Sequence, residues 1–194
     1  MKTCFTCVAT NIFLLASVPA IGSDDLPRGN PYGEQRPYGR HPGIDFMVDV
    51  GTPVIAPADG KVTEVRSFDG PRPWQGGWVV QLTHAEDFHS AFLHLTELHV
   101  EMGKLLKRGQ LIGLSGASNS GHAHLHFGTC GTPGKCFDFT YTSDPDKSWV
   151  GGKPQCFRPG NDYSHHTQRE LTLPLACHDY AKELLARIRS MKPK

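Results

Sequence analysis

Two short motifs in this 194-residue chain hold side chains of the kinds that bind metal ions. The first is His41-Pro42-Gly43-Ile44-Asp45, in which a histidine precedes a carboxylate by four residues. The Pro-Gly pair favours a tight turn, which folds the histidine back over the strand that displays the carboxylate. Imidazole and carboxylate are both ordinary zinc ligands, although a lone pair of this kind is more often a surface contact.

The second motif, His124-Leu125-His126-Phe127, alternates histidine with apolar residues. In a strand, residues two apart point to the same face, roughly 6.6 Å from each other. The two imidazoles would then lie side by side while Leu125 and Phe127 enter the core. Two polar residues on a solvated strand face would give the same pattern.

The elements that must position these motifs are short strands separated by glycine and proline turns. Ile44, Phe46 and Val48 alternate with Asp45 and Met47, which predicts a strand. Further strands are expected at 54–56, 62–65, 78–83, 91–95, 110–114 and 123–128. Residues 179–191 carry apolar side chains at helical spacing. The sequence therefore predicts a mainly β fold, an antiparallel β-sandwich or open barrel of short strands with a short C-terminal helix.

The N-terminus has the pattern of a secretory signal peptide. Lys2 precedes an apolar stretch at 12–18, and small residues follow at Ala16, Ala20 and Gly22. The expected location is therefore secreted or periplasmic. No other segment approaches the ~20 apolar residues that span a bilayer, so no stable membrane insertion is expected. The 20 basic and 19 acidic residues nearly balance, which gives no reason to expect nucleic acid as a partner.

Four cysteines follow the predicted signal peptide, and an even number in an exported chain favours two disulfides. Sequence alone leaves three pairings open, and a structural zinc site is the alternative. The four are Cys130, Cys136, Cys156 and Cys177.

A third motif, Phe92-Leu93-His94-Leu95, would by itself suggest a structural histidine. With the other two it resembles the lysostaphin and LytM type of zinc metallopeptidase. These are peptidoglycan endopeptidases, and the family includes LasA and the β-lytic proteases. The family pattern is H-x-x-x-D, then aromatic-x-H-L, then H-x-H followed by an aromatic, and this chain has all three in that order. The resemblance covers residues 38–128, including the segments 51–54, 58–62 and 107–110.

The resemblance implies a fold similar to the duplicated hybrid motif and a role for each motif residue. His41, Asp45 and His126 would bind Zn²⁺, which leaves one position open, as a catalytic zinc site requires. His94 and His124 would instead act on substrate and water, and which of them is the general base stays open.

Other positions match the family pattern less closely. Phe92 replaces a usual tyrosine, and Gly128 stands where an acid often follows. Tyr32 and Tyr38 are the candidates for a tyrosine that helps to hold the oxyanion. His84 is interpreted as structural, and His122 is expected to line the site.

The predicted organisation is a signal peptide at 1–22, a leader loop at 23–40, a zinc metallopeptidase core at 41–128 and a cysteine-containing extension at 129–194. The extension is expected to clamp the fold and also to shape the groove. The expected function is zinc-dependent hydrolysis of peptide crosslinks or stem peptides of bacterial peptidoglycan. Two alternatives stay open: a non-catalytic cell-wall module that binds or activates other wall hydrolases, and a secreted protease of ordinary proteins.

Overall fold

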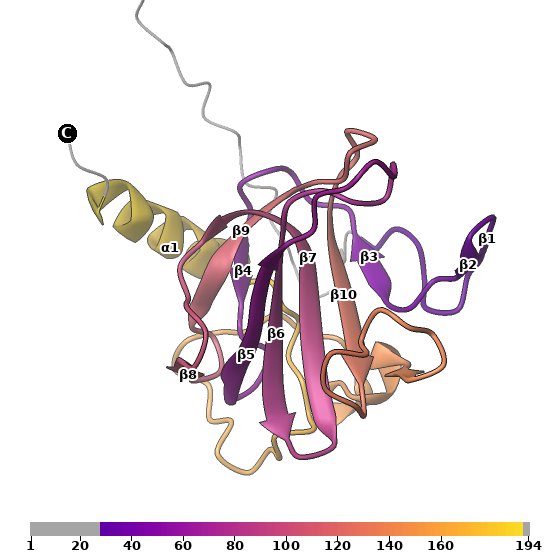
Figure 1. Cartoon of the computed structure of the whole chain (residues 1–194). Coiled ribbons are helices and arrows are strands. Elements are labelled where there is room, and N and C mark those ends of the chain that lie inside the picture. The colour runs from indigo at the N-terminus through magenta and orange to yellow at the C-terminus, as the bar shows by residue number, and fades with distance from the viewer. Residues whose placement is uncertain (1–27, 192–194) are drawn as a thin grey trace, which may run out of the picture.

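A nine-stranded antiparallel sheet carries the fold in the computed structural model, which describes residues 28–191 (Figure 1). A separate two-stranded hairpin precedes it, formed by β1 (Gln35–Arg36) and β2 (Gly39–Arg40). The sheet consists of β3 (Ile44–Phe46), β4 (Pro53–Ile55), β5 (Gly60–Ser67), β6 (Trp78–Ala85), β7 (Phe88–Leu98), β8 (Leu105–Leu106), β9 (Leu111–Ala117), β10 (Ala123–Cys130) and β11 (Thr142–Ser143). Two 3₁₀ turns, η1 (Pro145–Lys147) and η2 (Val150–Gly152), and the helix α1 (His178–Met191) follow.

The strands run in the order β11-β10-β9-β7-β6-β5-β8, with β3 paired to β10 and β4 paired to β9. The path has two ends, so the sheet is not closed into a barrel. The predicted mainly β, antiparallel, open architecture is confirmed. The expected C-terminal helix is also confirmed and begins one residue earlier than predicted, at His178.

Alternation of side chains along β3 sets which residues enter the core. Ile44, Phe46 and Val48 are buried, whereas Met47 is 47% exposed. Phe46 and Phe127 lie in the same apolar cluster, with ring centroids 6.4 Å apart. Burial of such large side chains is the main favourable contribution to folding. It also fixes the register of β3, because a slip of one residue would turn Ile44 and Phe46 outward.

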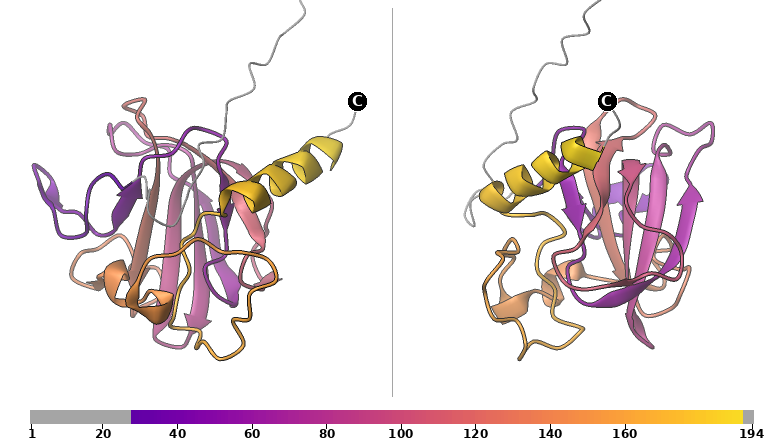
Figure 2. Two further views of the ribbon diagram at one scale, coloured as in Figure 1. Left: turned by 180° about the vertical axis from the view of Figure 1, so that it is seen from behind. Right: turned by 90° about the vertical axis from the view of Figure 1, so that its left-hand side faces the viewer.

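The C-terminal extension forms a second layer across the back of the sheet, as the two views in Figure 2 show. Its residues Leu171, Leu173 and Leu175 are fully buried in the same cluster as Phe127. The ring of Trp149 stacks on Phe127 with centroids 6.1 Å apart. The extension therefore supplies one side of the core rather than only clamping a finished domain.

Two disulfides hold the extension, and they select one of the three pairings that the sequence left open. Cys130 is bonded to Cys136, and Cys156 is bonded to Cys177. The four cysteines are therefore not ligands of a second zinc ion.

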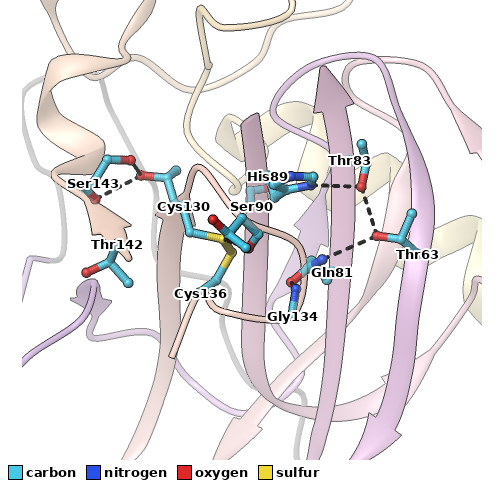
Figure 3. Close-up of a disulfide and its surroundings, with 12 residues drawn as sticks. Thr63, Gln81, Thr83, His89, Ser90, Cys130, Gly134, Cys136, Thr142 and Ser143 are labelled. Atoms are coloured by element: carbon cyan, nitrogen blue, oxygen red, sulfur yellow. Dashed lines mark hydrogen bonds between the residues drawn. A yellow bond between two sulfur atoms is a disulfide. The ribbon is translucent and has the colours of Figure 1, made fainter. Parts of the chain in front are cut away.

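The loop closed by Cys130 and Cys136 is also tied to the sheet by hydrogen bonds (Figure 3). The backbone N–H of Gly134 donates to Oε1 of Gln81, and the Gln81 amide in turn donates to the hydroxyl of Thr63. Gln81 is buried in β6, so satisfying both ends of its amide avoids a desolvation cost. The loop is thereby fixed against β5 and β6.

The predicted signal peptide at 1–22 lies outside the described residues. Residues 28–40 of the expected leader loop include the β1–β2 hairpin, so this part has regular structure that the sequence did not suggest. Within residues 28–191, no helix has the length and apolar character needed to cross a lipid bilayer.

Removal of either disulfide should lower the free energy of unfolding, and the longer loop should matter more. Cys156 and Cys177 are 21 residues apart, and Cys130 and Cys136 are 6 apart. Chain entropy gives about 3 kcal/mol for the first pair and about 2 kcal/mol for the second. Urea unfolding of the two double cysteine-to-alanine variants measures both losses. A larger loss for the shorter loop would contradict the entropic explanation.

His84 in β6 is a buried histidine held between two oxygens. Its Nδ1 lies 2.8 Å from the carbonyl oxygen of Asp59, and its Nε2 lies 2.7 Å from Oγ of Ser90. Burial lowers the pKa of His84 to about 4, and the bond to the Asp59 carbonyl opposes this shift only in part. The ring is therefore neutral and structural, as the sequence interpretation expected.

Stability should consequently fall as the pH drops from 6.5 towards 4. In that window the unfolded chain binds a proton at His84 and the folded chain does not, which costs roughly 3 kcal/mol. His84→Gln removes the titrating group, so its unfolding free energy should depend less on pH over this range. His165→Gln, at an exposed histidine, is the matched control and should keep the wild-type slope. An unchanged slope in His84→Gln would contradict this assignment.

Candidate metal centre and active-site groove

The pairing of β3 with β10 brings the first and last motifs together. In the antiparallel register His126 lies directly opposite Asp45. Nδ1 of His126 is 3.0 Å from Oδ1 of Asp45, and Nε2 of His41 is 2.9 Å from the first atom and 3.1 Å from the second. The three side chains are buried, so three potential ligand atoms form a small triangle shielded from solvent.

The turn at Pro42-Gly43 allows His41 to reach this triangle. A Cβ atom at residue 43 would lie 2.4 Å from the carbonyl oxygen of Phe127 and 2.8 Å from Nε2 of His126. Only glycine therefore lets the chain pass so closely over β10. The sequence prediction that this turn folds His41 back towards Asp45 is confirmed.

The hydrogen bond on the far side of His41 determines which nitrogen faces the triangle as an acceptor. Nδ1 of His41 lies 2.9 Å from the carbonyl oxygen of Pro31, which can only accept. The Nδ1–H therefore donates to Pro31, and Nε2 keeps its lone pair towards Asp45 and His126.

The donor set and its spacing fit a zinc ion. Two imidazoles and a carboxylate form a usual catalytic set, and ligands at about 2.0–2.1 Å in a tetrahedron are about 3.3 Å apart. The observed separations of 2.9–3.1 Å are slightly shorter than that value. Three atoms in this arrangement also leave a fourth position for water or substrate.

Charge at the centre is set by burial and by hydrogen bonds. Burial alone would raise the pKa of Asp45, but its close interactions with His126 and His41 outweigh burial and hold this pKa far below its usual range. Burial lowers the pKa of His126 and keeps its ring neutral. An ionised carboxylate beside the neutral ring of His126 is the protonation state that metal binding requires.

His94 and His124 lie next to the triangle, with ring centroids 4.5 Å apart. Nδ1 of His94 donates to the carbonyl of Gly76 at 3.0 Å, and Nδ1 of His124 donates to the carbonyl of His122 at 2.9 Å. In the neutral rings each Nε2 then keeps a lone pair. That of His124 is 3.8 Å from Oδ1 of Asp45.

His94 is also strained and desolvated. Its φ of 65° is in the left-handed region, and no other non-glycine residue within 28–191 has a positive φ. Burial, reinforced by the neighbouring His124, lowers the pKa of His94 to about 3. Backbone strain of this kind is concentrated at functional sites. The structure thus places a neutral histidine with a free Nε2 beside the candidate metal centre.

The five residues line a groove of about 680 Å³. His122 also lines it, which confirms that prediction. Of the two candidate tyrosines, Tyr38 lines the groove but stacks on Trp74 with centroids 4.1 Å apart. Tyr32 is directed away, because its hydroxyl donates to the carbonyl of Thr142.

One ring nitrogen of His126 has no hydrogen-bond partner among the described residues. Gly128 replaces a frequent acid, and Nε2 of His126 is buried without a hydrogen-bond acceptor in residues 28–191. Conversely, the sequence gave no sign of Arg36, which donates to Oδ2 of Asp45 at 2.8 Å. Its position in a polar segment did not distinguish it from the other arginines.

Comparison with known proteins gives the class of the chain. The model of peptidase family M23 matches residues 39–135, which is half of the sequence and contains all five residues. The chain belongs to peptidase family M23.

Two curated relatives illustrate the range of the family. Glycyl-glycine endopeptidase ALE-1 of Staphylococcus capitis is 40% identical over 112 residues, which is 54% of this chain and 29% of that protein. Peptidoglycan DD-endopeptidase ShyB of Vibrio cholerae is 40% identical over 88 residues, 45% of this chain and 20% of that one. The chain therefore matches less than a third of the length of either relative.

Solved structures agree with the fold. The catalytic domain of lysostaphin from Staphylococcus simulans has a TM-score of 0.52 at 30% identity, covering 63% of this chain and 91% of that one. A zinc-containing peptidase from Vibrio cholerae has a TM-score of 0.50 at 29% identity, covering 63% and 36% respectively.

Gly43→Ala should disrupt the triangle, because the added Cβ would meet the Phe127 carbonyl oxygen and the His126 ring. The added Cβ would push the His126 ring from its place, so zinc retained after dialysis should fall at least tenfold. Metal analysis of the purified protein gives this number. Gly131→Ala is the matched control, since its Cβ would meet only the carbonyl oxygen of Asp87, at 3.6 Å. Wild-type zinc content in Gly43→Ala would contradict the close approach.

Proposed function

We propose that this protein is a zinc-dependent endopeptidase that hydrolyses peptide bonds in bacterial peptidoglycan. The observation that carries the proposal is the buried triangle of two imidazoles and one carboxylate, with two further histidines beside it in one groove. Membership of peptidase family M23 and the printed activities of ALE-1 and ShyB support the same class of substrate.

In this proposal Nε2 of His41, Oδ1 of Asp45 and Nδ1 of His126 bind the zinc ion. The ion supplies Lewis-acid activation of water and of the scissile carbonyl group. One carboxylate among three ligands leaves the ion with a net positive charge, which favours that activation. All three residues line the groove, so an ion held by them would be open to substrate from that side.

His94 and His124 provide the proton transfers. Their Nδ1–H groups are held by the carbonyls of Gly76 and His122, so each Nε2 can accept a proton from the attacking water. The low pKa of His94 keeps its ring neutral at pH 7. The ring that has taken up the proton then returns it to the leaving amine.

The substrate follows from the groove and the family. An open groove on a sheet can admit an extended peptide, and aromatic side chains such as Trp74 and Phe137 line it. The relatives cut different bonds by name, a glycyl-glycine bond for ALE-1 and a DD-peptide bond for ShyB. Mass spectrometry of digested muropeptides identifies the bond that this protein cuts. Export through the predicted signal peptide at 1–22 would bring the protein to the wall.

Zymography on purified cell walls tests the proposal. Wild-type protein should clear the wall, and a zinc chelator should abolish the clearing. His126→Ala should reduce the rate at least a thousandfold, because loss of one of three ligands removes the catalytic ion. His165→Ala, at an exposed histidine of the extension, is the control and should retain activity. Clearing that persists both with chelator and in His126→Ala would exclude a zinc mechanism.

A further inference from the structure

The two carboxylate oxygens of Asp45 face different partners. Oδ1 lies in the triangle with His41 and His126, whereas Oδ2 accepts a hydrogen bond from Nη2 of Arg36 at 2.8 Å. The Asp45 side chain is 4% exposed and that of Arg36 is 19% exposed, so this ion pair is largely shielded from water. Charge-assisted hydrogen bonds in such surroundings are strong and directional.

Arg36 is itself held in place. Its Nε donates to Oε2 of Glu34 at 3.1 Å, and both carboxylate oxygens of Glu34 accept from the side-chain amide of Asn30, at 2.9 and 2.8 Å. The planar guanidinium group thus donates from Nε to Glu34 and from Nη2 to Asp45. Hydrogen bonds between side chains therefore connect Asn30, Glu34 and Arg36 in series to the carboxylate of Asp45.

The same segment is attached to β3 through its backbone. The N–H of Gly29 donates to the carbonyl of Asp45 at 2.8 Å, and the N–H of Asp45 donates to the carbonyl of Asn30 at 3.0 Å. At the next residue, the carbonyl of Pro31 accepts a hydrogen bond from Nδ1 of His41. All of these supports precede residue 39, where the match to the family model begins.

We propose that Arg36 is a positioning residue that fixes Asp45 so that only Oδ1 is presented to the zinc ion. With Oδ2 held by the hydrogen bond from Arg36, the carboxylate is kept from rotating or from binding through both oxygens, which would fill the open position needed for water. This inference rests on the zinc site of the proposed function. Arg36 lies before residue 39, so it would be a support for the zinc site that the family match does not include.

Charge and orientation must be separated in the test, because a guanidinium group near a cation also repels it. Glu34 offsets that charge from the other side. Two variants therefore keep the net charge. Arg36→Lys retains the positive charge but lacks the fork, and the double variant Glu34→Gln/Arg36→Gln removes one charge of each sign.

The experiment measures zinc affinity of the full chain by competition with a chromophoric chelator. The absorption spectrum of the cobalt-substituted protein reports the coordination geometry. Both variants should bind zinc about tenfold more weakly, as is typical when a hydrogen-bonding partner of a ligand is lost. Their cobalt spectra should shift relative to wild type. Arg28→Lys is the matched control, because Arg28 lies in the same segment but pairs with Asp146, and its affinity and spectrum should be unchanged.

Three results would overturn the inference. Wild-type affinity and spectrum in both Arg36 variants would show that Arg36 has no positioning role, and wall cleavage by the wild type would then still support the proposed function. An equal loss in Arg28→Lys would show a general effect of the segment on folding. A wild-type protein that binds no zinc would remove the proposed function together with this inference.

Discussion

The antiparallel register between β3 and β10 is the constraint on which the rest of the site depends. It sets Asp45 directly opposite His126, and the turn through Gly43 then has only to bring His41 over the same point. The register is enforced by burial on the other face, where Ile44 and Phe127 pack into the core. A slip by one residue would expose those apolar side chains and separate the ligand atoms at the same time.

Backbone carbonyls give three histidines of the groove the same tautomer. The carbonyls of Pro31, Gly76 and His122 each accept the Nδ1–H of a different ring, from His41, His94 and His124 respectively. Every one of these rings is thereby left with a lone pair on Nε2. His126 is the exception, since its Nδ1 faces the triangle. Backbone carbonyls in loops therefore determine which ring nitrogen of each histidine carries the proton.

The C-terminal extension and the segment before β3 pack against the strands that carry the site. The extension fills the back of the core with Leu171, Leu173 and Leu175, against which the strands of the site pack. The segment before β3 binds both His41 and Asp45 through Pro31 and Arg36. Buried ligands held from several sides lose little freedom when an ion binds, which is the general advantage of a preorganised site.

The sequence by itself determined the longer strands and the C-terminal helix, the five motif residues and the family they resemble, because these depend on local spacing and residue type. It left open the disulfide pairing and gave no sign of Arg36, and it offered Tyr32 and Tyr38 as equal candidates. Only the tertiary structure decided these points. Each is a contact between residues far apart in the chain or a choice of side-chain direction, such as Cys156 with Cys177, and such contacts are fixed by packing and register rather than by local pattern.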